Sequence, residues 1–208
     1  MIENKAIGGT CVNVGCVPKK VMFNLTSFLE AADIMKHYGV EFGGVKLDFA
    51  KFKAARDAYV HRLNGIYKSN IDKQSISYFT GTAAFESKDT VITSEGERLT
   101  APHICIASGS TPAKVDIEGG EHCMSSDDFF AMETLPKSIV VIGGGYIGVE
   151  LAQILHALGV KVTLVVRSVL LRFVDDDVRA VLEECIAKSG LQLVRKVHKK
   201  VTKDETSG

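Results

Sequence analysis

A glycine-rich stretch between two apolar segments leaves few choices of fold. Gly143-Gly-Gly145-Tyr-Ile-Gly148 fits G-x-G-x-x-G, follows a predicted strand over 138–142 and opens a predicted helix over 146–158. A second strand is predicted over 160–166. Glycine lets the chain turn sharply into a helix whose N-terminal N–H groups favour a pyrophosphate. The pattern predicts a parallel strand-helix-strand unit that binds a dinucleotide, and a glycine turn chosen only for packing is the alternative.

The end of the second predicted strand carries Arg167, and Arg172 follows five residues later. An NAD-specific site of this type normally has Asp or Glu there, which accepts hydrogen bonds from the ribose 2′-hydroxyl. Arginine cannot accept those bonds, but its planar fork of donors suits a 2′-phosphate. We therefore expect NADPH to be preferred over NADH, and the alternative is that both arginines are solvated surface charges.

Two cysteines stand five positions apart in Cys11-Val-Asn-Val-Gly-Cys16, at the start of a helix predicted over 17–38. A helix N-terminus stabilises a thiolate and lowers the pKa of a cysteine. On an ideal helix their Cα atoms lie about 8 to 9 Å apart, farther than a disulfide allows, so the first turn must distort at Gly15. This predicts an easily reduced disulfide, and zinc binding or two unpaired buried thiols are the alternatives. The other cysteines are predicted to be packing residues: Cys105, Cys123 and Cys185.

The remaining pattern alternates helices and strands, which is typical of an α/β fold with parallel strands. A second helix is predicted over 49–67, and strands over 75–79, 83–85, 90–93 and 103–107. The proline-containing, polar stretch over 111–137 is predicted to connect two domains.

Charge and hydropathy exclude several kinds of partner. The chain has 25 Lys and Arg against 25 Asp and Glu, so no net charge favours nucleic acid or an anionic membrane. Its apolar runs are shorter than the roughly 20 residues that span a bilayer, and no secretory signal follows Met1. We expect small-molecule partners, no nucleic acid, no membrane and no metal, in a cytoplasmic protein, with an organellar form left open.

The run Gly8-Gly-Thr-Cys-Val-Asn-Val-Gly-Cys-Val-Pro-Lys-Lys20 resembles the active-site segment of the class I pyridine nucleotide-disulfide oxidoreductases. Lipoamide dehydrogenases and mercuric reductases typically show Ser where Lys19 stands, and lipoamide dehydrogenases have an acidic residue in place of Arg167. Residues 56–67 further resemble the glutathione reductases, and the thioredoxin reductases are the nearest competitor.

The resemblance implies two Rossmann-like domains, both incomplete: residues 1–109 in an FAD-binding domain and 110–208 in an NADPH-binding domain. It implies that NADPH reduces FAD, which reduces the cysteine pair, and that glutathione disulfide is the substrate. Cys16 would be the thiol next to the flavin, and Cys11 would attack the substrate.

Further roles are carried over by position. Lys19 and Glu150 would pair near the reactive flavin nitrogen, Tyr146 would gate the nicotinamide pocket, and Tyr59 and Tyr67 match positions near the substrate. NADPH contacts would be Gly143, Gly145, Gly148, Arg167 and Arg172. FAD contacts would be Glu3, Thr10, Cys11, Cys16, Lys19, Thr82, Ala83, Ser108, Gly109 and Ser126.

The family has a further glycine-rich loop before these segments and an acid-base histidine in a dimerisation domain after them. We therefore expect a sequence truncated at both ends, whose full-length enzyme is a homodimer. The isolated chain is expected to bind FAD poorly and to reduce glutathione disulfide negligibly. A thioredoxin reductase-like enzyme and a truncated NADPH-binding module without catalysis are the alternatives.

Overall fold

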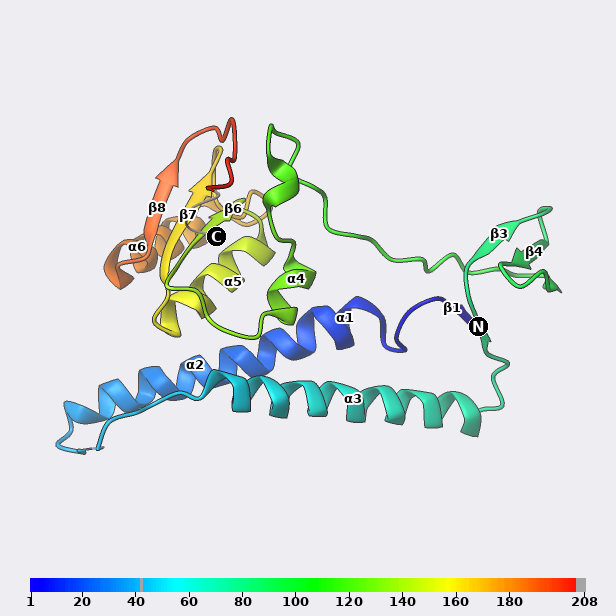
Figure 1. Ribbon diagram of the computed structural model, residues 1–208, viewed down its shortest axis with the longest axis horizontal. Coiled ribbons are helices and arrows are strands. Elements are labelled where there is room, and N and C mark those ends of the chain that lie inside the picture. The colour runs from blue at the N-terminus through cyan, green and yellow to red at the C-terminus, as the bar shows by residue number, and fades with distance from the viewer. Residues whose placement is uncertain (42, 205–208) are drawn as a thin grey trace. The chain divides into compact units, whose positions relative to one another are not determined.

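The computed structural model describes residues 1–41 and 43–204, and the chain divides into two compact units. The first unit comprises residues 1–18 and 54–111, and the second comprises the described residues of 19–53 and 112–208. Helices and strands occur in both units, which confirms the predicted α/β class (Figure 1). Over the described residues, each helix is too short or too polar to cross a bilayer.

Within 1–73, the described residues form the helices α1 (Gly9–Val14), α2 (Cys16–Lys36) and α3 (Phe49–Lys73). The helices predicted over 17–38 and 49–67 are thus confirmed, although α3 runs farther than its pattern indicated. Ile71 is buried near its end, and Lys68 forms an ion pair with Asp72 one turn later. Both interactions stabilise the last turns of the helix.

The strands of the first unit form two small sheets. β1 (Ile2–Glu3) pairs in parallel with β2 (Phe79–Thr80), and β3 (Ala83–Phe85), β4 (Thr90–Thr93) and β5 (Arg98–Thr100) form an antiparallel sheet in that order. The strands predicted over 83–85 and 90–93 are confirmed, whereas only the last residue of 75–79 lies in a strand. β5 was not predicted, because it is a polar three-residue segment held by its register with β4.

The strand predicted over 103–107 is not present in the structure, where this segment is irregular. A strand requires a neighbour for its backbone hydrogen bonds, and no described strand pairs with these residues. Its side chains are correspondingly open to solvent: Ile106 is 73% exposed and Cys105 is exposed. The packing role predicted for Cys105 is therefore wrong, and so is that of Cys185, which is exposed on a helix surface.

The second unit is built on a parallel sheet in the order β6-β7-β8, with a helix in each connection (Figure 1). The strand-helix-strand prediction over 138–166 is confirmed, and a further helix and strand extend it. Besides most of α2 and the start of α3, the unit contains the 3-10 helix η1 (Gly120–His122), α4 (Ser126–Ala131), β6 (Ser138–Ile142), α5 (Tyr146–Ala157), β7 (Lys161–Val166), α6 (Asp176–Ser189) and β8 (Gln192–Arg195).

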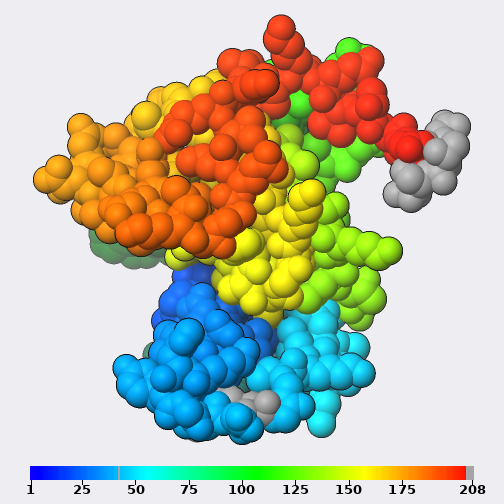
Figure 2. Space-filling view, turned by 90° about the vertical axis from the view of Figure 1, so that its left-hand side faces the viewer, coloured from blue at the N-terminus to red at the C-terminus, as the bar shows by residue number. Residues whose placement is uncertain are grey.

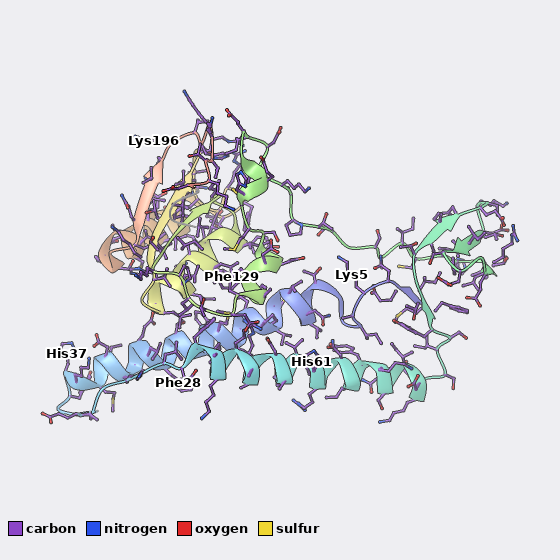
Figure 3. All side chains as sticks on the ribbon, viewed as in Figure 1. Lys5, Phe28, His37, His61, Phe129 and Lys196 are labelled. Carbon is purple, nitrogen blue, oxygen red and sulfur yellow. The ribbon has the colours of Figure 1, made fainter. Side chains whose placement is uncertain are left out.

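The core of this unit lies between β7 and α5. Alternate residues of β7 are buried, as in a strand packed on a helix, and Leu164 is fully buried. α5 contributes Ala152 and Leu155 from its buried face. Phe129 of α4 is also buried in this unit and packs edge-on against Phe130 (Figure 3). The burial of these apolar groups fixes where the ends of β6 and β7 lie, and the candidate site depends on those ends.

The chain after β8 returns to the segment that precedes α4. Val201 N donates to Glu118 O at 2.9 Å, and Lys200 forms an ion pair with Glu118. The space-filling view shows the two segments in contact, red against green (Figure 2). We call this contact of residues 118–119 with 200–201 the clasp.

Candidate functional site

The glycine motif forms the turn between β6 and α5. Gly143 has φ +126°, a conformation that side chains disfavour. A Cβ at Gly148 would lie 2.6 Å from Gly143 O, and one at Gly144 would lie 2.7 Å from a methyl carbon of Val166. These glycines are therefore required where the helix starts close to the strand, and Tyr146 is the first residue of α5.

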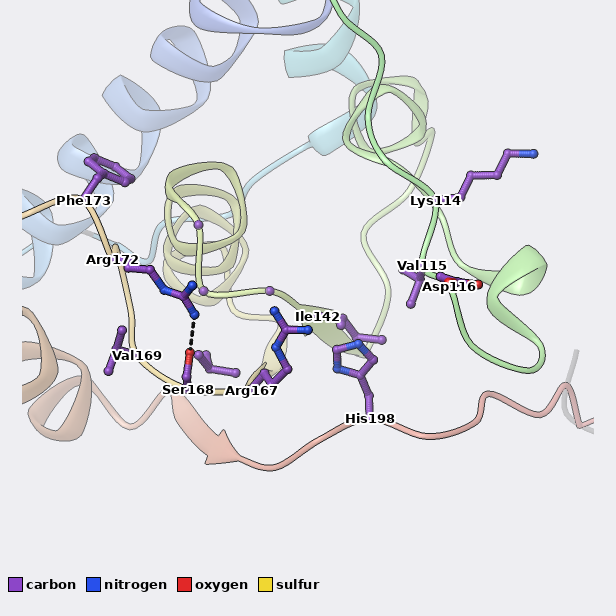
Figure 4. Close-up of a pocket in the computed structure, with 14 residues that line it drawn as sticks. Lys114, Val115, Asp116, Ile142, Arg167, Ser168, Val169, Arg172, Phe173 and His198 are labelled. Atoms are coloured by element: carbon purple, nitrogen blue, oxygen red, sulfur yellow. Dashed lines mark hydrogen bonds between the residues drawn. The ribbon is translucent and has the colours of Figure 1, made fainter.

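A cavity of about 590 Å³ lies beside this turn and the end of β7 (Figure 4). Arg167 and Arg172 both line it, together with Gly143 and Gly145. The N-terminus of α5 and two guanidinium groups thus face one cavity, which favours a ligand with several negative charges. The structure brings these sequence-predicted residues together.

Backbone and side-chain hydrogen bonds hold the loop that carries the second arginine. Leu171 N donates to Gly144 O at 2.7 Å, which fastens the loop to the glycine turn. Arg172 Nη2 donates to Ser168 Oγ at 3.0 Å. From α6, Arg179 donates to Leu170 O at 2.9 Å and to Val174 O at 3.0 Å. The position of Arg172 is therefore set before any ligand binds.

Sequence reasoning missed several residues of this cavity. Ser168 directly follows a predicted residue, so its position offered a signal. Lys114 and Asp116 lie in the predicted connector, and His198 follows a strand that was not predicted. For these three no sequence motif was available, because the fold alone brings them to the cavity.

The cysteine segment shows the distortion that the spacing predicts. α1 ends at Val14 and α2 begins at Cys16, so the helical path breaks at Gly15. A Cβ at Gly15 would lie 2.8 Å from Thr10 O and 3.3 Å from Cys11 Cα. A side chain there would push the two cysteine-bearing turns apart, so the break depends on glycine.

The structure has Cys11 and Cys16 as free thiols and not as the predicted disulfide, and both are exposed, which contradicts the alternative of two buried thiols. A side-chain hydrogen bond with Cys16 raises the pKa of Cys11, and slight burial of this otherwise exposed thiol and the charge of Cys16 add to this, whereas a backbone hydrogen bond from Cys16 lowers it. The pKa lowering expected from the helix N-terminus is therefore wrong for Cys11. The reason is that ionising Cys11 breaks the hydrogen bond its proton makes and brings two negative sulfurs together.

Two asparagines, which the sequence analysis missed, support this segment. Asn13, between the cysteines, donates from Nδ2 to Gly9 O at 2.8 Å. Asn64 of α3 donates from Nδ2 to Ile7 O at 2.7 Å and to Asn13 Oδ1 at 2.9 Å. These bonds tie α1 to the turn before it and to α3. For Asn13, its place between the two cysteines was the available signal, whereas Asn64 offered none because it lies on α3.

Lys19 and Glu150, which the resemblance pairs, form an ion pair with 2.8 Å between Nζ and Oε1. Their side chains are 25% and 42% exposed, so water screens the pair only in part. They line a cavity of about 360 Å³ in the second unit, together with Phe23 and Gln153.

The other predicted positions are less informative. Glu3 Oε1 accepts from the backbone N–H groups of Asn4 and Lys5, and Thr82 N donates to the Ser94 hydroxyl. Tyr59 and Tyr67 are partly exposed on α3. Three of the remaining positions lie in the first residues of an element: Thr10 in α1, Ala83 in β3 and Ser126 in α4. Ser108 and Gly109 lie in an irregular segment.

A glycine turn beside two arginines, and two cysteines at a broken helix start, are the features expected of a nicotinamide-dependent class of thiol-disulfide proteins. Residues 1–207 match the family model of pyridine nucleotide-disulphide oxidoreductases, and the chain belongs to that family. Within it, the chain is similar to the glutathione reductase of Yarrowia lipolytica (strain CLIB 122 / E 150), with 41% identity over 209 residues. The match covers 94% of this chain and 44% of the relative, so the chain spans less than half the length of that protein.

Proposed function

We propose that this chain provides the redox cysteines and the NADPH site of a glutathione-disulfide reductase. The observation that carries the proposal is the hydrogen-bonded thiol pair of Cys11 and Cys16, held together by the break at Gly15. The similarity to a glutathione reductase supports glutathione disulfide as the substrate. The proposed reaction consumes NADPH, a proton and one glutathione disulfide, and yields NADP⁺ and two glutathione molecules.

The chemistry at the cysteines follows thiol-disulfide exchange. The Cys11 thiolate attacks one sulfur of glutathione disulfide and releases the first glutathione thiolate. Cys16 then attacks the sulfur of Cys11, releases the second glutathione and forms the Cys11–Cys16 disulfide. Because the pKa of Cys11 is raised, its proton must pass to an acceptor before the first attack.

The residues of the second unit fit NADPH. An added Cβ at Gly143 or Gly145 would meet no atom within 4 Å, so the backbone there is open to a pyrophosphate at the start of α5. Arg167 and Arg172 line the same cavity and supply donors for a 2′-phosphate. NADPH, and not NADH, is therefore the proposed electron donor.

FAD, when bound, passes two electrons from NADPH to the cysteine disulfide. Lys19 and Glu150 line the cavity of about 360 Å³, and their ion pair fixes the Lys19 ammonium group beside it, where it would face a flavin ring if FAD binds there. Lys19 would hold the ring by donating a hydrogen bond, and Glu150 would fix the orientation of Lys19. The parallel β1–β2 pair and the sheet of the second unit support two Rossmann-like domains, each present in part. A homodimer of the full-length enzyme and a cytoplasmic location remain predictions.

The exchange half-reaction tests the proposal without any cofactor. The reduced chain is mixed with glutathione disulfide, and the products are identified by mass spectrometry. We expect a Cys11–Cys16 disulfide in the parent, glutathione trapped on Cys11 in Cys16→Ser, and little reaction in Cys11→Ser. Cys185→Ser, which removes an exposed thiol on α6, is the control and should behave like the parent. Failure of the parent to form a Cys11–Cys16 disulfide would contradict the proposal.

An NADPH-binding module without catalysis is the second candidate, because every residue of the larger cavity lies in the second unit. NADPH binding without exchange at Cys11 would favour this function. A thioredoxin reductase-like enzyme would instead oxidise its cysteines faster with a protein disulfide than with glutathione disulfide.

A further inference from the structure

The strand order β6-β7-β8 sets the direction of a bound dinucleotide. In the proposed function, the pyrophosphate lies at the start of α5 next to β6, and the 2′-phosphate lies near Arg167 at the end of β7. The ribose that carries the 2′-phosphate is joined to the pyrophosphate on one side and to the adenine base on the other. The base therefore reaches the segment that follows β8, and this inference rests on the proposed NADPH site.

His198 lies in that segment, shortly after β8 ends at Arg195. It lines the cavity of about 590 Å³ with Arg167 and Ile142, and its ring points from the segment toward Ile142 (Figure 4). Its Nδ1 atom is buried and has no hydrogen-bond partner among the described residues. Buried polar atoms are nearly always hydrogen-bonded, so this atom calls for a partner that arrives with the ligand.

The clasp fixes the wall that carries His198. Val201 N donates to Glu118 O at 2.9 Å, and the ion pair of Lys200 with Glu118 reinforces this contact. A Cβ at Gly119 would lie 1.8 Å from Val201 O, so the approach depends on glycine. The backbone that carries His198 is therefore held at the cavity before binding, which lowers the entropy cost of recognition, and rotation about the side-chain bonds of His198 would present Nδ1 to the ligand.

We propose that His198 recognises the adenine base of NADPH, through ring contact and a hydrogen bond from or to Nδ1. An imidazole nitrogen donates or accepts according to its tautomer. Adenine offers both partners on its edge, an amino donor and ring-nitrogen acceptors. The 2′-phosphate is the weaker candidate for this contact, because Arg167 and Arg172 already supply its donors and it lies at β7.

Calorimetric titration of the full 208-residue chain tests this assignment. The probes are NADPH, NADH and adenosine 2′,5′-bisphosphate. His198→Phe keeps a planar ring and removes both nitrogens, and we expect it to weaken all three by a similar factor of about 10, because all three contain adenine. His198→Asn places an amide near the Nδ1 position and should restore most of the affinity. His37→Phe, beyond the end of α2, is the matched control and should bind like the parent (Figure 3).

The outcomes separate this inference from the proposed function. A loss confined to NADPH, with NADH unaffected, would assign His198 to the 2′-phosphate and overturn the proposal. Unchanged affinities in a His198→Phe chain with parental circular dichroism would overturn it too. A parent chain that binds none of the probes would refute the NADPH site itself. As a second measurement, the Nδ1 resonance of His198 in the parent must shift when adenosine 2′,5′-bisphosphate is added.

Discussion

At the scale of single residues, charge complementarity decides which nicotinamide nucleotide the second unit prefers. Arg167 follows β7 directly, and Arg172 is held by Ser168 on a loop fastened to the glycine turn. A guanidinium that hydrogen-bonds to a phosphate contributes about 1.5 to 3 kcal/mol. NADH lacks the 2′-phosphate and gains nothing from either arginine.

We therefore expect Arg167→Leu to weaken NADPH binding by about 10- to 100-fold and to leave NADH binding nearly unchanged. Arg172→Leu should act in the same direction with a smaller effect, because part of its hydrogen bonding serves Ser168. The measurement is a titration with both nucleotides. Arg98→Leu, which breaks an exposed ion pair with Glu86, is the control. Equal losses for NADPH and NADH would show that the arginines do not read the 2′-phosphate.

The thiol pair makes a prediction about pH. The hydrogen bond with Cys16, burial and the charge of Cys16 raise the pKa of Cys11, so Cys11 becomes reactive only at a higher pH than an ordinary thiol. Cys16→Ala removes the first and third of these causes and keeps the backbone N–H. Its alkylation rate at Cys11 should therefore rise at lower pH than in the parent. The pH profile of alkylation, read by mass spectrometry at Cys11, checks this, and a profile shifted upward would refute the assignment.

At the scale of elements, the junction of α1 and α2 depends on one glycine. Gly15→Ala places a methyl carbon 2.8 Å from Thr10 O, so the two turns must separate. We expect a loss of about 1 to 3 kcal/mol in the free energy of unfolding and a slower exchange reaction with glutathione disulfide. Gly65→Ala in α3 meets no atom within 4 Å and should instead stabilise the helix by about 0.5 to 1 kcal/mol. If both substitutions changed the free energy of unfolding and the exchange rate alike, the junction of α1 and α2 would not depend on Gly15.

The β7–α6 loop depends on a residue outside the cavity. Arg179 is a positioning residue, because it bonds to the carbonyl oxygens of Leu170 and Val174 on either side of Arg172. Arg179→Leu should destabilise the chain by about 1 to 3 kcal/mol and raise the Kd for NADPH more than the Kd for NADH. Lys188→Leu, which breaks an exposed ion pair on the same helix, should change neither quantity.

The sequence predicted elements best where a local pattern was strong. The apolar strand of residues 138–142 matches β6 in both bounds, and the glycine turn and α5 follow as predicted. The failures were of another kind. Residues 103–107 have the apolar pattern of a strand, but whether a strand forms depends on a neighbour that the pattern cannot supply.

The residues of the candidate site also differ in whether a local pattern predicts them. Cys11, Cys16 and the glycines were found because each belongs to a contiguous motif. His198 and Asp116 reach the cavity through the fold, and Asn64 reaches the cysteine segment from a different helix. Contacts between distant parts of the chain leave no spacing rule in a single sequence.

At the scale of the whole molecule, each of the two compact units carries a different proposed function. The cysteines lie in the first unit, and the glycine turn, both arginines and His198 lie in the second. A nucleotide that binds only the folded second unit stabilises it by about 2.7 kcal/mol when present at 100 times its Kd. The first unit gains nothing directly, because none of its described residues lines the cavity.

Hydrogen exchange with and without NADP⁺ tests this separation. Amides of β6, β7 and α5 should exchange about 100-fold more slowly with saturating nucleotide, wherever exchange requires unfolding of the second unit. Amides of β3, β4 and β5 should exchange at unchanged rates and serve as the internal control. Arg167→Leu should abolish the protection at low nucleotide concentration, because occupancy falls with affinity. Equal protection in both units would mean that the chain unfolds as one cooperative body, and the nucleotide would then stabilise the cysteine segment as well.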